Sequence, residues 1–86
     1  MADILVVDNE ERMCKLIETA LTMENHQVST MFSGSDAIDS LNNNSFDLVI
    51  TDLKMSNIDG LQVLKHAKSL SDPPEVILIT AYASQQ

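Results

Sequence analysis

Three short apolar runs, each ending at a polar side chain that carries oxygen, constrain the fold of this chain more than any other feature. The runs are Ile4–Val7, Leu48–Thr51 and Val76–Ile79, and they end at Asp8, Asp52 and Thr80. Such short runs are typical of buried parallel strands and too short for helices. The carboxyl ends of parallel strands meet at one edge of a sheet, where open α/β sheets bind ligands. We therefore expect four side chains to gather there: Asp8, Asn9, Asp52 and Thr80.

Helical patterns separate these strands. Apolar residues between Glu11 and about Glu24 recur at the spacing of an amphipathic helix, with Asn25 as its expected stop. The residues expected to face inward are Met13, Leu16, Ile17, Ala20 and Leu21. The Ser33–Asp36 turn can cap a second helix that buries Ala37, Ile38 and Leu41 and ends in the 42–45 polar run.

A third helix is expected to begin at Asp59 as its N-cap and to stop before Pro73, because proline cannot continue a helix. Its expected buried residues are Leu61, Val63, Leu64, Ala67 and Leu70. Residues 27–31 alternate and are expected to form an edge strand. Strand, helix, strand, helix, strand, helix, strand predicts an α/β fold with a parallel sheet covered by helices in three layers, α/β/α.

Composition excludes several function classes. Thirteen acidic residues against five basic ones give a net charge of −8, so contact with nucleic acid would meet electrostatic repulsion. No apolar run approaches the length of a membrane span. Cys14 is the sole cysteine, so an intrachain disulfide is impossible and we expect a reducing, cytoplasmic compartment.

The paired carboxylates carry the chemical argument. A single aspartate after a strand is often a turn residue or a helix cap, whereas Asp8 and Asp52 both end apolar strands of one sheet. Clustered carboxylates repel each other, and Mg²⁺ suits such a site because it takes hard oxygen ligands and needs few carboxylates. A carboxylate held there can attack a phosphoryl group, and a hydroxyl such as that of Thr80 can contact the phosphoryl oxygens.

Four segments, in this order and spacing, resemble the receiver domains of two-component response regulators. They are Ile4–Glu10, Asp47–Met55, Ile58–Leu64 and Val76–Tyr82. The sequence around Asp52 and Thr80 looks most like that of receivers attached to σ54-dependent activators. The resemblance implies the flavodoxin-like strand order of that family and a signalling module, not a turnover enzyme.

The resemblance also implies roles for individual residues. Asp52 would accept a phosphoryl group from a phosphohistidine on a sensor histidine kinase, and an output domain would follow Gln86. Thr80 would be the switch hydroxyl, and Ala81 would offer its backbone amide to the phosphoryl group. The implied Mg²⁺ ligands are Asp8, Asn9, Asp52 and the backbone carbonyl of Lys54.

Three departures from the family pattern matter. Asn9 stands where a second acid is usual, so one charge of the metal site is missing, and Ser56 stands where proline is common. The family's fifth strand, with its phosphoryl-contacting lysine, has no counterpart among the 86 residues, so the chain corresponds to the N-terminal two-thirds of a receiver. We expect the 76–79 strand to become an apolar edge through which copies self-associate.

Two alternatives stay open from the sequence. The chain could be a receiver-like interaction module that is not phosphorylated, as the missing lysine and Asn9 suggest. It could also be a phosphatase resembling the haloacid dehalogenases, with Asp8 as nucleophile, Glu10 as its second acid and Thr80 on a later strand; that reading leaves the Asp52 segment unexplained.

Overall fold

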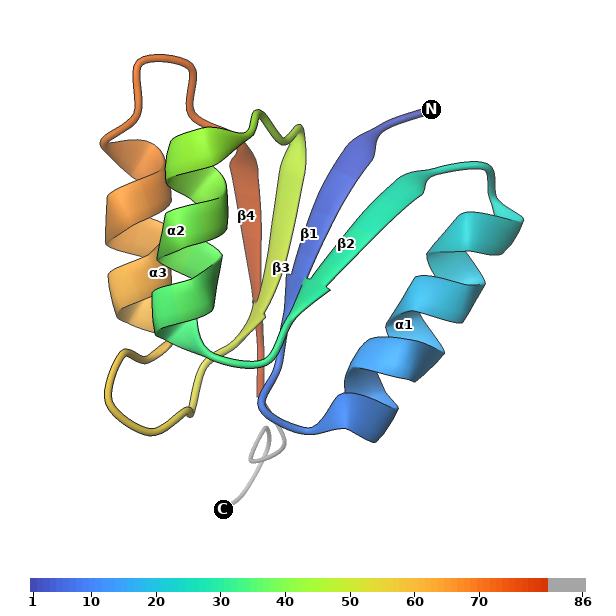
Figure 1. The fold of residues 1–86 in the computed structure, drawn as a ribbon, viewed down its shortest axis with the longest axis horizontal. Coiled ribbons are helices and arrows are strands. Elements are labelled where there is room, and N and C mark those ends of the chain that lie inside the picture. Colours follow the sequence, from blue (N-terminus) through green and yellow to red (C-terminus); the bar gives the residue numbers. More distant parts are fainter. Residues whose placement is uncertain (81–86) are drawn as a thin grey trace.

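The computed structural model describes residues 1–80 as four strands alternating with three helices (Figure 1). The elements are β1 (Asp3–Val7), α1 (Glu11–Met23), β2 (Gln27–Met31), α2 (Gly34–Asn43), β3 (Leu48–Asp52), α3 (Gly60–Lys68) and β4 (Glu75–Ile79). This order confirms the alternating α/β fold expected from the apolar runs. Within the described part, no helix is both long and apolar enough to traverse a bilayer.

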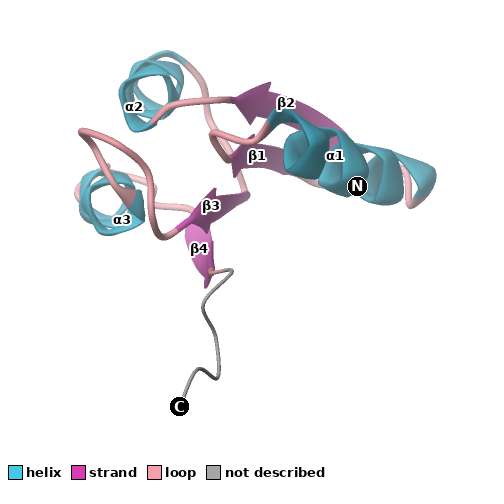
Figure 2. Ribbon diagram, turned by 90° about the horizontal axis from the view of Figure 1, so that it is seen from below, coloured by secondary structure: helices cyan, strands magenta, loops and turns pink. Residues whose placement is uncertain are grey.

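The sheet is parallel throughout, with the strand order β2-β1-β3-β4. The all-apolar strand β1 is central and the alternating strand β2 lies at an edge, as their patterns predict. Helix α1 covers one face, and α2 and α3 lie side by side on the other (Figures 1 and 2). The three-layer α/β/α architecture and its flavodoxin-like strand order are therefore confirmed.

A core lies on each side of the sheet because successive strand residues face opposite ways. The larger core, on the side of α2 and α3, consists of Leu5, Val7, Ala37, Leu41, Val49, Val63 and Ala67. The smaller core, on the side of α1, consists of Ile4, Val6 and Cys14. These side chains are at most 3% exposed, so the sheet is anchored most firmly around β1.

The helix ends follow the capping residues found in the sequence. Ser33 caps α2 by accepting the Asp36 N–H, and Asp59 caps α3 by accepting the Gln62 N–H. Helix α1 ends at a left-handed Asn25 with φ of 69°. The next N–H, that of His26, donates to the Leu21 carbonyl, and the Asn25 N–H donates to Thr22, which is the Schellman arrangement.

The inward face expected for α1 was wrong in part. Met13 and Leu16 are 36% and 65% exposed and Ala20 is exposed, whereas Cys14 is the buried residue of this helix. Helix α1 packs only on β1 and β2, so no described strand covers the flank that carries Met13 and Leu16. Ile17 and Leu21 do pack against the core as expected.

Two further burial expectations were wrong. Leu61 is 48% exposed, because α3 turns Val63 and Ala67 toward the sheet instead. Strand β4 exists but is not buried: Ile77 is 48% and Leu78 37% exposed. Within residues 1–80 it pairs with β3 alone, and α1 does not reach it.

Candidate functional site

The carboxyl ends of the four strands gather at one pole of the molecule, at the bottom of Figure 1. Val7 pairs with Thr51 and Asp52 with Ile79, so Asp8 follows β1 beside Asp52, and Thr80 follows β4. A hollow of about 200 Å³ lies there, lined by Asp8, Asn9, Glu10, Met13, Asp52, Ile79 and Thr80. The structure thus brings Asp8, Asn9, Asp52 and Thr80 together; Ala81 lies outside the described residues.

Asp8 is held from two sides. Its N–H donates to the Met31 carbonyl at 3.1 Å, which ties the end of β1 to the end of β2. Its Oδ1 accepts the Glu10 N–H at 2.9 Å, and this hydrogen bond fixes the orientation of the carboxylate where the chain leaves β1. The residue is 6% exposed, so this carboxylate lies at the floor of the hollow.

Asp52 is half-buried and electrostatically strained. Burial raises the pKa of its carboxyl group, and the neighbouring carboxylates of Asp8 and then Glu10 add to the rise, while the backbone N–H groups of Lys54 and Leu53 oppose it. The Lys54 N–H reaches Asp52 Oδ1 at 3.4 Å, a long hydrogen bond. A pKa raised on folding means that the ionised form costs stability, and this cost disappears as the pH falls through the folded pKa. A bound cation would remove the same cost at neutral pH.

The loop after Asp52 is fixed by a glycine. A Cβ on Gly60 would overlap the backbone carbonyl oxygen of Asp52 and lie 2.9 Å from the Leu53 Cα, so only glycine fits there without displacing the backbone. The Gly60 N–H donates to the Leu53 carbonyl at 3.0 Å, and the Leu53 N–H donates to Ile79 at 2.8 Å. The start of α3 and the end of β4 therefore both hold the Asp52 backbone.

Cys14 attaches α1 to the same pole. Its Sγ donates to the Asp8 carbonyl at 3.4 Å, with the Met31 carbonyl at 3.8 Å. Burial, followed by the nearby Asp8 carboxylate, raises the pKa of this thiol to about 11, so the group stays protonated at neutral pH and keeps its role as a donor. Cys14 is 1% exposed, so its thiol packs in the interior of the protein.

The donor set suits a hard cation. The hollow offers the carboxylates of Asp8, Glu10 and Asp52 and the Asn9 amide, and such hard oxygen atoms are the ligands that Mg²⁺ takes, with water completing its shell. Lys54 is not among the residues that line it. Residues 1–80 hold no group of three or more His, Cys, Asp or Glu side chains placed to bind a metal.

Sequence reasoning missed other parts of this site. The sequence pointed to Glu10 only as the second acid of the alternative phosphatase, but this residue precedes α1 and lines the hollow with Met13 and Ile79. Its position two residues after Asp8, in the strand-to-helix connection, was the available signal. The close approach of Gly60 to Asp52 gave no signal, because it depends on the path of the loop.

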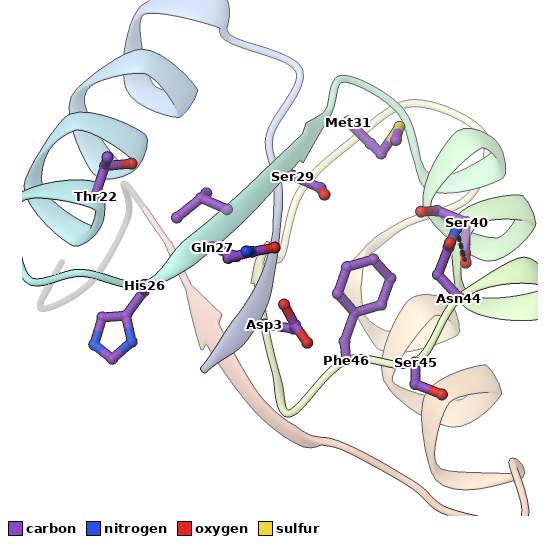
Figure 3. Close-up of a pocket in the computed structure, with 11 residues that line it drawn as sticks. Asp3, Thr22, His26, Gln27, Ser29, Met31, Ser40, Asn44, Ser45 and Phe46 are labelled. Atoms are coloured by element: carbon purple, nitrogen blue, oxygen red, sulfur yellow. Dashed lines mark hydrogen bonds between the residues drawn. The ribbon is translucent and has the colours of Figure 1, made fainter. Parts of the chain in front are cut away.

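A larger hollow of about 670 Å³ lies elsewhere, along β2 and the end of α2 (Figure 3). Its described lining is mainly uncharged: Gln27 and Ser29 come from β2, Ser40 comes from α2, and Asn44 follows that helix beside the Phe46 ring. Asp3 is the one acid among these described residues. This hollow has more room but fewer reactive groups than the site at the strand ends.

Comparisons with known proteins agree on one family. The sequence model of the response regulator receiver domain matches residues 4–86. "Response regulator ArlR" of Staphylococcus aureus is 35% identical over 81 residues, which are 94% of this chain and 36% of that relative. The chain therefore spans about a third of the length of such curated relatives.

Solved structures give the same result. The response regulator TrrA of Thermotoga maritima, solved in complex with Mg(2+)-BeF, matches 96% of this chain and 72% of its own with a TM-score of 0.89 and 34% identity. A receiver domain from Clostridium thermocellum matches 93% of this chain and 65% of its own, with a TM-score of 0.81 and 34% identity.

Proposed function

Because this chain belongs to the response regulator receiver domains, we propose that Asp52 accepts a phosphoryl group from a phosphohistidine on a sensor histidine kinase. The observation that carries the proposal is the shared hollow: Asp8 and Asp52, from adjacent strands, line it together with Thr80. An aspartate that only caps a helix would need neither a second carboxylate nor a hydroxyl group beside it. The raised pKa of Asp52 is consistent with a carboxylate that is stabilised only when its charge is matched.

The chemistry is a transfer between two nucleophiles. A carboxylate oxygen of Asp52 attacks the phosphorus of the phosphohistidine; the new P–O bond forms as the P–N bond breaks, and the imidazole nitrogen keeps the electron pair. The transferred phosphoryl group brings negative charge into the hollow, where the carboxylates other than Asp52 repel it. The Thr80 hydroxyl donates to a phosphoryl oxygen, and the Ala81 amide donates to another.

We assign Mg²⁺ to the acidic end of the hollow, where Asp8, Asn9, Asp52 and the Lys54 backbone carbonyl would hold it. The ion supplies charge neutralisation for the phosphoryl oxygens when it is bound. Asp8 supports this role because its carboxylate is buried and oriented by the Glu10 N–H. The Mg(2+)-BeF complex of the Thermotoga relative is consistent with the assignment.

The family also suggests partners. We propose that the chain acts in the cytoplasm, with a sensor histidine kinase as donor, an output domain as the recipient of the signal, and a binding surface that switches through Thr80. The exposed edge of β4 supports self-association of the chain, since Ile77 and Leu78 lie there partly open to solvent.

Acetyl phosphate provides the test. With Mg²⁺ present, we expect labelling to approach one phosphoryl group per chain, and Asp52→Asn to abolish it. The matched control is Asp72→Asn, an exposed loop aspartate away from the hollow. Sustained turnover lost only in Asp8→Asn would instead indicate a hydrolase. A folded wild-type chain that binds Mg²⁺ but takes no label would indicate an interaction module that is not phosphorylated.

A further inference from the structure

The segment from Leu53 to Asp59, called here the phosphoacceptor loop, is anchored at both ends. At its start the Leu53 N–H and carbonyl bond to Ile79 and Gly60, as described above. At its end Asp59 and Gln62 exchange two hydrogen bonds, 3.1 and 3.0 Å long, as the cap of α3. Ile58, just before the second anchor, takes part in none of these hydrogen bonds.

Near its end, at Ile58, the phosphoacceptor loop rests on the first residue of α2. A Cβ on Gly34 would overlap the backbone carbonyl oxygen of Ile58 and lie 2.7 and 2.8 Å from two Ile58 side-chain carbons. Gly34 is buried, and Ile58 packs against the larger core together with Met55. Just before this contact, Asn57 adopts a left-handed conformation with φ of 65°.

This contact is independent of the local demands of the helix. Ser33 already caps α2, so glycine is not needed for capping, and a glycine inside a helix costs about 1 kcal/mol relative to alanine. The φ of Gly34 is not positive, so backbone conformation does not demand glycine either. The remaining structural reason for a residue without a side chain at position 34 is the close approach of Ile58.

We propose that Gly34 is a positioning residue for the cation and phosphoryl site: it lets Ile58 seat against α2, and so fixes the loop that carries Lys54, whose N–H reaches Asp52 Oδ1 and whose carbonyl we assign to the ion. The inference rests on the proposed function of the site. A side chain at position 34 would push Ile58 outward, and the displacement would pass through three residues to Lys54. Asp52 itself stays held by Gly60, so the effect falls on the loop ligand.

The test compares Gly34→Ala with Ser35→Ala, an exposed neighbour in the same helical turn. We expect the apparent dissociation constant for Mg²⁺ to rise about tenfold in Gly34→Ala, which corresponds to about 1.4 kcal/mol, and to stay unchanged in Ser35→Ala. Amide chemical shifts should change within residues 53–59 before Mg²⁺ is added. Urea unfolding identifies conditions under which each variant is fully folded.

Ile58→Ala gives a second route if Gly34→Ala folds poorly, because it removes from the loop side the Ile58 Cγ2 methyl group that lies against Gly34. It should raise the same constant by about threefold, and the effects of the two variants together should be less than multiplicative. Unchanged Mg²⁺ affinity in a folded Gly34→Ala or Ile58→Ala protein overturns the inference while leaving the proposed function standing. A wild-type chain that neither binds Mg²⁺ nor accepts a phosphoryl group overturns both.

Discussion

At the scale of single residues, Asn9 distinguishes this chain from the acidic pattern that its family resemblance implies. Its amide oxygen can contact a cation, but it brings no charge to a hollow that contains Asp8 and Asp52. Replacing Asn9 by Asp should strengthen Mg²⁺ binding about tenfold, or about 1.4 kcal/mol, since one more carboxylate then faces the ion. Titration of both proteins with Mg²⁺, followed by amide chemical shifts, measures the difference.

The control for added charge is Ser71→Asp, which places the same charge in the exposed loop before β4. Its Mg²⁺ affinity should equal that of the wild type, because screening weakens a charge that far from the hollow. Equal affinity for Asn9→Asp and wild type would show that position 9 does not contact the ion.

The residues of the site were predictable where strand geometry alone determines their position. Asp8, Asp52 and Thr80 follow apolar runs, and parallel strands bring such ends together. Glu10 was harder to predict, because a helix boundary one residue earlier would have placed it in α1. The contacts of Gly34 and Gly60 could not be predicted, because they depend on where the loop runs after it leaves the sheet.

At the scale of elements, the start of α3 depends on one side chain. Asp59 accepts the Gln62 N–H at 3.1 Å, and the Gln62 Oε1 accepts the Asp59 N–H at 3.0 Å. Asp59→Ala removes the cap and should lower the free energy of unfolding by about 1 kcal/mol. Urea denaturation measures this loss, with Asp72→Ala as the control that removes an exposed charge without touching a helix end. Equal losses in the two variants would contradict the capping role.

Helix α1 shows how far periodicity can predict an element. The spacing of apolar residues located the helix and its Asn25 stop, and it identified Ile17 and Leu21 as core residues. The spacing could not show which side of the apolar stripe would pack against a strand, because that depends on how many strands the helix covers. Since α1 covers β1 and β2 alone, the flank with Leu16 remains exposed.

At the scale of the whole molecule, the apolar edge of β4 should drive self-association. Ile77→Lys should reduce it, because a lysine on an edge strand opposes pairing with another chain. The matched control is Leu61→Lys: Leu61 and Ile77 are both 48% exposed, but Leu61 lies on α3, away from that edge. Sedimentation velocity over a range of protein concentrations and salt measures the effect; the net charge of −8 opposes association less at high salt. A monomeric wild-type chain at high concentration would refute the expectation.

The strand order has a consequence for synthesis. β1 is an interior strand, yet it is made before either of its neighbours, β2 and β3. Ribosomes add roughly 5–20 residues per second, so Val7 waits about 2 to 9 seconds before Asp52 has been joined to the nascent polypeptide. During that interval the most fully buried strand of the described sheet cannot yet pair with β3, so its apolar side chains are not covered as they are in the folded protein.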